Sequence, residues 1–180
     1  MLAAKEPAAK ALEALPPKVL VVMGSDSDWR VMKQTVATLR EFQVACAVEV
    51  ASAHRSPEKA LGLSATAREK GFRVIIAGAG GAAHLAGVLA AKTTLPVIGV
   101  PIGGGALGGL DALYATVQMP AGVPVATVAI DGGKNAALLA IQILALREPA
   151  LAAALATYKE KLARQVEEKS ARLQSLLPQD

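Results

Sequence analysis

The sequence VIIAGAGG at residues 74–81 joins a continuous apolar run to a cluster of glycines. A continuous apolar run is typical of a strand buried on both faces of a parallel sheet. The glycines predict a loop at the end of that strand, and residues 82–92 that follow have the length of a helix. The stretch therefore predicts a strand, a loop and a helix, which together form the repeating unit of an α/β fold.

The same alternation continues on both sides of this stretch. Short β-branched or apolar runs each end in a loop of Gly, Ser or Pro and precede a helix-length segment. The runs cover residues 19–23, 44–51, 73–77, 97–100 and 123–130. The helical segments cover about residues 28–42, 57–70, 82–92, 108–118 and 134–147. This pattern predicts one α/β domain at residues 18–147, with a five-stranded parallel sheet covered on both faces.

The two ends of the chain lie outside this pattern. Residues 1–17 are rich in Ala, Lys and Glu and end in two prolines, so we expect a flexible leader. Their charges also differ from the apolar region of a secretory signal. Residues 148–180 repeat apolar side chains at helical spacing, which predicts a long C-terminal helix. That helix could pack on its own domain or on a neighbouring subunit.

The composition argues against several classes of protein. The mean hydropathy is +0.40, yet the longest uncharged stretches, 93–110 and 112–130, are interrupted by Gly and Pro. Neither provides the roughly 20 continuous apolar residues of a spanning helix. The net charge of +4 is not clustered, and aromatic residues, at 3%, are too few for a nucleic-acid stacking surface. Cys46 has no partner for an intrachain disulfide, so we expect a soluble, cytoplasmic protein.

In an open parallel sheet, ligands bind beyond the carboxyl ends of the strands, where the strand order reverses. The loop after the first predicted strand is GSDSDW, residues 24–29. Its polar side chains could act only as helix caps, but four in a row exceed that need. Together with the free amides of a helix N-terminus, Ser25, Ser27 and Asp28 predict a site for a phosphate or for ribose hydroxyls.

The loop after the second predicted strand is SAHRSPE, residues 52–58. Ser56 and Pro57 form an ordinary helix start, which does not require His54 or Arg55. Histidine exchanges protons near neutral pH, and a guanidinium can hold a phosphate or a carboxylate. A position at a strand end favours an acid/base role for His54 over a role in the core.

The loop after the third predicted strand is GAGGAAHLAG, residues 78–87. It matches the dinucleotide pattern G-x-G-x-x-A only weakly, and it follows the third strand instead of the first. Its small side chains would let the backbone approach a flat ligand. His84 could line the pocket or cap its helix. Elsewhere, the Gly-rich segments 103–109 and 131–135 lack the Lys-Ser/Thr of a P-loop, and the sequence contains no metal-spaced Cys/His cluster.

Five blocks of the sequence resemble one known family. They are GSDSDW at 24–29, SAHRSP at 52–57, AGAGGAAHL at 77–85, LPVIGVP at 95–101 and VQMPAGVPVATVAI at 117–130. In this order they resemble the bacterial N5-carboxyaminoimidazole ribonucleotide mutase family of purine biosynthesis, over about residues 18–147. Trp29 and the Ser-Ala-His-Arg block resemble this mutase class and not the animal-type class, which carboxylates aminoimidazole ribonucleotide directly.

The resemblance implies a flavodoxin-like three-layer αβα sandwich, a homo-octamer, and no metal or organic cofactor. It implies that CO2 moves from N5 to C4 of a ribonucleotide, with His54 as the general acid/base. The residues it places around the ribonucleotide are Ser25, Asp28, Ser52, Arg55, Ala79, Gly80, Gly81 and His84. Two alternatives are a related carboxylase that uses CO2 directly and a noncatalytic nucleotide-binding module. The module would leave His54 beside Arg55 unexplained.

The chain also departs from the family pattern. Ala86 stands where Pro is usual, Ala112 replaces a Ser, and glycines fill 103–105 where the family has a more polar stretch. The turn after the fifth strand is about two residues short and has Asp131 where Gly is usual. We expect these changes to affect loop order and subunit contacts. Between residues 96 and 146 only three residues are charged, which predicts apolar faces buried between subunits.

Overall fold

The computed structural model describes residues 15–176, which fall into two compact units divided between Ile143 and Leu144. Most of the predicted leader, residues 1–14, lies outside the described residues. The first unit alternates strands and helices. Its elements are β1 (Val19–Met23), the 3-10 helix η1 (Asp26–Asp28), α2 (Trp29–Glu41), β2 (Cys46–Val50), α3 (Pro57–Thr66), β3 (Val74–Gly80), α4 (Leu85–Ala90), β4 (Val97–Ile102), α5 (Leu110–Val117), β5 (Ala126–Thr127) and α6 (Gly133–Ala145).

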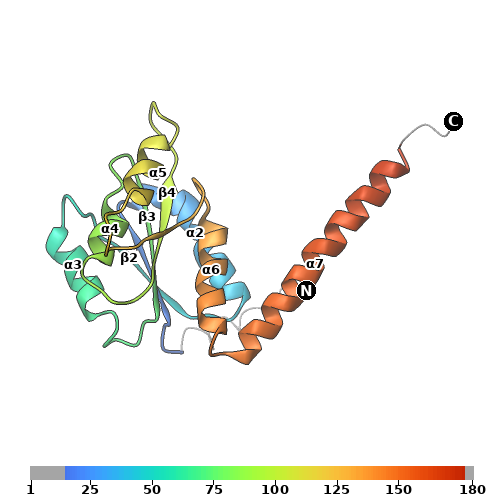
Figure 1. Ribbon diagram of the computed structural model, residues 1–180, viewed down its shortest axis with the longest axis horizontal. Coiled ribbons are helices and arrows are strands. Elements are labelled where there is room, and N and C mark those ends of the chain that lie inside the picture. The colour runs from blue at the N-terminus through green and yellow to red at the C-terminus, as the bar shows by residue number, and fades with distance from the viewer. Residues whose placement is uncertain (1–14, 177–180) are drawn as a thin grey trace. The chain divides into compact units, whose positions relative to one another are not determined.

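The five strands form one parallel sheet in the order β2-β1-β3-β4-β5. Figure 1 shows α2 and α6 on one side of this sheet and α3 and α4 on the other. The order reverses between β1 and β3, which lie side by side although η1, α2, β2 and α3 separate them in the chain. The predicted flavodoxin-like sandwich is therefore confirmed, and its switch point lies between β1 and β3.

The central strands are apolar because both of their faces are covered. Every residue of β1 and β4 is buried, as are the first five of β3. Leu20 and Ile75 face a core shared with Leu85 and Leu89 of α4. On the other face, the Thr35 hydroxyl of α2 donates a 2.9 Å hydrogen bond to the carbonyl of Gly133, at the start of α6. The continuous apolar runs in the sequence reflect this two-sided burial.

The boundaries of four strands differ from the prediction, and the differences are largest at β5 and β3. Of the predicted strand 123–130, only Ala126–Thr127 pairs with β4. Pro124 has no amide hydrogen to give to the ladder, which suits the short edge strand found here. By contrast β3 continues to Gly80, because Ala79 and Gly80 pair with the last residues of β4. The expectation that a loop starts at Gly78 was therefore wrong by three residues.

The second unit contains α7 (Pro149–Gln174), the long C-terminal helix that the apolar spacing predicts. Proline is favoured at the first position of a helix, where its missing amide hydrogen costs no bond. Leu162, Val166 and Leu173 are exposed in the single chain. A lone helix cannot bury its own apolar side chains. The surface that covers them, on this domain or on a neighbouring subunit, stays a prediction. Among residues 15–176, no helix combines the length and apolar character needed to cross a membrane.

Candidate functional site

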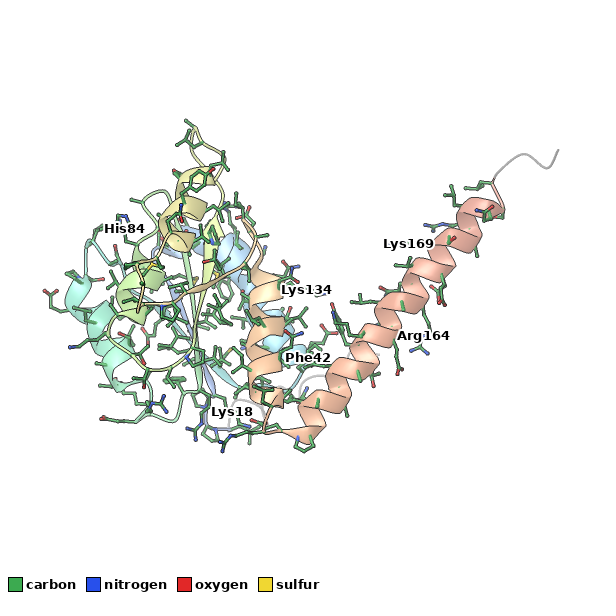
Figure 2. The ribbon with its side chains drawn as sticks, in the orientation of Figure 1. Lys18, Phe42, His84, Lys134, Arg164 and Lys169 are labelled. Carbon is green, nitrogen blue, oxygen red and sulfur yellow. The ribbon has the colours of Figure 1, made fainter. Side chains whose placement is uncertain are left out.

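The loops after β1 and β2, together with the end of β3 and the loop after it, line one pocket. Its volume is about 340 Å³. The residues that line it are Gly24, Ser25, Ser27, Asp28, Ser52, Ala53, His54, Arg55, Ala79, Gly80, Ala82 and Leu85. The pocket lies at the carboxyl end of the sheet, beside the β1/β3 switch point. Figure 2 shows His84 at this end and Lys18, which precedes β1, at the other.

The first loop is held in shape by its own polar groups. The Gly24 amide donates to the Gly78 carbonyl at 3.0 Å, which fixes the loop to β3. Ser25 caps the short helix η1, and its amide donates to the Asp28 carboxylate at 3.0 Å. The hydroxyls of Ser25 and Ser27 lie 3.0 Å apart, and both residues line the pocket. This arrangement presents two hydroxyls at the start of α2, where the helix dipole favours an anion.

Asp28 is the buried acid of the pocket. The residue is only 7% exposed, and burial raises the pKa of its carboxyl above the ordinary value. The Ser25 amide and the positive charge of Arg30 oppose this increase. A carboxylate that has lost water and keeps only the backbone hydrogen bonds of Ser25 and Gly24 retains unused acceptor positions. These positions suit the hydroxyl groups of a sugar.

The second loop is a closed turn built by two serines. The Ser52 amide donates to the Ser56 hydroxyl at 2.9 Å, and the Arg55 amide donates to the Ser52 hydroxyl at 3.1 Å. These bonds fix the turn that carries His54 and Arg55. The Arg55 guanidinium also donates to the Gly24 carbonyl at 3.5 Å, which brings it to the first loop. The positive charge therefore lies beside the Ser25 side of the pocket.

His54 and His84 come together although 30 residues separate them in the sequence. Nε2 of His54 lies 2.9 Å from Nδ1 of His84, and the rings meet edge to face at 83°. The side chain of His84 makes no capping hydrogen bond at the start of α4. The structure therefore does not show the capping role, and it places His84 against His54, beside the pocket, without His84 lining it. One nitrogen must donate and the other accept, so this contact restricts the tautomers of both rings.

The pocket wall formed by Ala79 and Gly80 is the end of β3. A Cβ on Gly80 would lie 3.1 Å from the Ile102 carbonyl oxygen, so a larger residue would push β3 and β4 apart. Gly81 turns the chain away with a φ of +60°, which glycine adopts without strain. Of the predicted site residues, Gly81 and His84 adjoin the pocket without lining it. Four further lining residues carry no polar side chain that would predict a site, but each is adjacent to a predicted residue: Gly24, Ala53, Ala82 and Leu85.

A second hollow of about 360 Å³ extends the polar surface toward β2. It shares Gly24, Ser25, Ser52 and Arg55 with the pocket and adds Asp26, Val50 and Ser56. The shared residues form a continuous polar floor, wide enough for a ligand longer than one ring. Within residues 15–176, no three His, Cys, Asp or Glu side chains gather as metal ligands would.

The switch-point pocket, its serine hydroxyls and its arginine define a doubly wound α/β protein with a site suited to a phosphorylated nucleotide. The chain belongs to the AIR carboxylase family, whose model matches residues 18–165. An N5-carboxyaminoimidazole ribonucleotide mutase of Pyrococcus horikoshii is 54% identical over 160 residues, which cover 89% of this chain and 90% of that relative. The resemblance stated from the sequence blocks is therefore confirmed.

Two further proteins extend the comparison. A phosphoribosylaminoimidazole carboxylase of Schizosaccharomyces pombe is 49% identical over 160 residues, which cover 89% of this chain but 29% of that relative. The crystal structure of Treponema denticola PurE matches with a TM-score of 0.78 and 28% identity, covering 87% of this chain and 98% of that one. The family thus includes relatives named for two different reactions.

Proposed function

We propose that this chain is an N5-carboxyaminoimidazole ribonucleotide mutase of purine biosynthesis. The observation that carries the proposal is the meeting of His54, Arg55, Ser25 and Asp28 around one pocket. Close similarity over nearly the whole length of a relative with this name supports it. The reaction would move CO2 from the exocyclic N5 to ring C4 and give the 4-carboxy-5-aminoimidazole ribonucleotide.

Binding of the ribonucleotide would use the polar floor of the pocket. Arg55 and the hydroxyls of Ser25 and Ser27 are the groups that suit a phosphate, since a guanidinium and neutral donors both bind its oxygens. Asp28 would accept hydrogen bonds from ribose hydroxyls. Ser52 contributes its own hydroxyl hydrogen, because its oxygen already accepts from the Arg55 amide.

The chemistry requires one group that first gives a proton and then takes one. A proton from His54 to N5 allows the N5–carboxyl bond to break, and the bonding electrons stay on nitrogen as CO2 leaves. C4 of the resulting enamine-like ring then attacks the carbon of CO2. Removal of the C4 proton by His54 restores the aromatic ring and returns His54 to its starting state. Atoms and charge balance without an oxidant, a reductant or ATP.

Between the two steps CO2 has to stay in the pocket. Ala79, Gly80 and Ala82 form a wall with no bulky side chain, so a flat imidazole can lie against the backbone. Close contact on that side leaves little room for water beside the reacting atoms. The Gly/Ala-rich segment therefore has a chemical use beyond the tight turn at Gly81.

The test is an isomerisation assay on the wild type and on His54→Asn. We expect the wild type to convert the N5-carboxylated ribonucleotide without ATP. The variant should lose about 10²–10⁴-fold in kcat, the usual contribution of general acid/base catalysis, while calorimetry still detects nucleotide binding. Full activity in His54→Asn would exclude the acid/base role. No turnover by the wild type would exclude the mutase function itself.

We also propose the assembly and location that accompany this function. A homo-octamer in the cytoplasm is supported by apolar side chains on and beside α5 that stay exposed in the single chain. They are Leu107, Leu110, Tyr114 and Val117. An apolar surface of this kind is typical of an obligate interface. Light scattering at micromolar concentration tests the octamer, and a monomer would exclude it.

A second candidate function is the direct carboxylation of aminoimidazole ribonucleotide by CO2. The name of the S. pombe relative and the description of the matching family favour it. The two reactions share the C4 attack on CO2 and differ in where the CO2 comes from. Turnover of both substrates at low bicarbonate separates them, because only the carboxylase then slows for lack of CO2.

A further inference from the structure

Asp131, in the turn after β5, binds the end of β4 through both its backbone amide and its carboxylate. The Asp131 amide donates to the Pro101 carbonyl at 2.9 Å, and the Asp131 Oδ1 accepts from the Gly103 amide at 2.8 Å. Oδ2 of the same carboxylate lies 3.6 Å from the Arg30 guanidinium. That guanidinium donates in turn to the Gly103 carbonyl. Both backbone groups of Gly103 are therefore bound, one by Asp131 and one by Arg30.

Asp131 makes these contacts from a backbone conformation that glycine adopts more easily. Its φ is +57°, in the left-handed region. Aspartate tolerates this region better than most residues but less well than glycine. The conformation alone would therefore favour Gly at this position. The contacts of the carboxylate give a physical reason for Asp in its place.

Gly103 is also the point where the glycine-rich loop 103–109 closes on itself. A Cβ on Gly109 would lie only 2.8 Å from the Cα of Gly103, so the two ends of the loop are in contact. Gly104, Gly105, Gly108 and Gly109 all have positive φ values. A loop this rich in glycine has little stiffness of its own. Its order depends on what holds Gly103.

Two short paths lead from Gly103 to the pocket. The preceding residue, Ile102, pairs with Gly80, and its carbonyl oxygen would lie 3.1 Å from a Cβ on Gly80. Gly80 is part of the pocket wall. On the other side, Arg30 lies in the first turn of α2, two residues after the buried Asp28. The contacts of Asp131 are thus connected to the pocket wall through Ile102 and Gly80, and to the buried acid Asp28 through Arg30.

We propose that Asp131 is a positioning residue, which holds Gly103 and Arg30 so that Gly80 and Asp28 keep the pocket in its binding shape. This role rests on the proposed mutase function. Of its two contacts, the hydrogen bond to Gly103 matters more, because it holds the backbone of the glycine-rich loop directly. The pair with Arg30 is about half-exposed on both sides and contributes little. His54 lies on a different loop, so we expect the loss of these contacts to leave the rate of the chemical step unchanged.

The test compares Asp131→Gly with Asp131→Asn. Glycine accepts the φ of +57° and removes both contacts, whereas asparagine keeps an acceptor for the Gly103 amide and loses only the charge. We expect Asp131→Gly to raise KM about tenfold with kcat within about twofold, the pattern of lost ground-state binding. Asp131→Asn should stay within about twofold of the wild type, since an exposed ion pair is weak. Thermal unfolding should remain cooperative in both.

A readout independent of catalysis separates this proposal from the proposed function. Hydrogen exchange should become faster at residues 101–109 and 78–82 in Asp131→Gly, and not in Asp131→Asn. Glu49→Gln is the matched control, because it removes the charge of an exposed pair with Lys59 on the edge strand. It should change neither exchange at these segments nor KM. Unchanged exchange in Asp131→Gly would overturn the proposal even if the wild type lacks mutase activity. Faster exchange without a change in KM would also overturn it.

Discussion

The two halves of the carboxyl end of the sheet are held in different ways. At β1 and β2, the loops are fixed mainly by bonds between residues three or four apart, such as Ser25 with Asp28 and Ser52 with Ser56. At β4 and β5, the end of the sheet is fixed by Asp131 and Arg30, which lie 28 and 73 residues from Gly103. The first half is therefore shaped mainly by local bonds, and the second by bonds between residues far apart in the chain.

The two halves of the carboxyl end of the sheet therefore contribute to the site in different ways. The locally built loops carry the polar side chains that line the pocket. The half around Gly103 carries no predicted catalytic group, yet its neighbour Ile102 packs against Gly80 of the pocket wall. Substitutions in the first half should therefore act on binding and catalysis directly, whereas substitutions in the second should act through stability and position.

The largest effect is expected from Arg55→Ala, which removes the positive charge from the locally built half. Hydrogen bonds to charged groups contribute about 1.5–3 kcal/mol, so affinity for the ribonucleotide should fall about 10–100-fold. Calorimetric titration at low and high salt measures the change. Arg73→Ala, which removes the same charge beside the amino end of β3, should bind like the wild type. Equal affinity in both variants would contradict the placement of the phosphate at Arg55.

A smaller effect, on stability alone, is expected from Gly99→Ala in β4. An added methyl group would collide with the Thr116 side chain of α5, and overpacking of this kind costs about 1–3 kcal/mol. Gly62→Ala is the matched control, because nothing lies within 4 Å of the added group and alanine favours the helix by about 0.5–1 kcal/mol. Urea unfolding should therefore move in opposite directions. A stabilised Gly99→Ala variant would show that α5 is loosely packed.

The same contrast explains what the sequence predicts well. The apolar runs of β1 and β3 predict buried parallel strands, because burial on both faces leaves no place for polar residues. The polar loops predict the pocket, since parallel strands bring their carboxyl ends to one edge. Ser25 and Asp28 could be identified because four polar residues in a row follow Gly24 directly at a strand end. These features depend on residues close together in the chain.

Other features depend on contacts between distant residues, which no local sequence pattern predicts. The pairing of His54 with His84 arises from the sheet order, so the sequence leaves the role of His84 open. β5 pairs with β4 over only two residues, although its apolar run predicts a longer strand. The hydrogen bond between Asp131 and Gly103 also joins residues far apart in the chain. From the sequence alone, Asp131 is only a departure from the family pattern.

The smallest effect is expected from Asp28→Asn, through pH. Burial raises the pKa of the Asp28 carboxyl in the folded state, so the folded protein binds a proton more tightly than the unfolded chain. Stability linked to this group is therefore present below the ordinary pKa of aspartate and is lost as the pH rises through the higher folded value.

Asparagine keeps an acceptor for the Ser25 amide without the buried charge. Chemical unfolding at pH 3 and pH 7 should show a gain for Asp28→Asn at pH 7 alone, together with weaker ribonucleotide binding. A loss of stability at pH 7 would instead mean that the Ser25 bond outweighs the cost of burial.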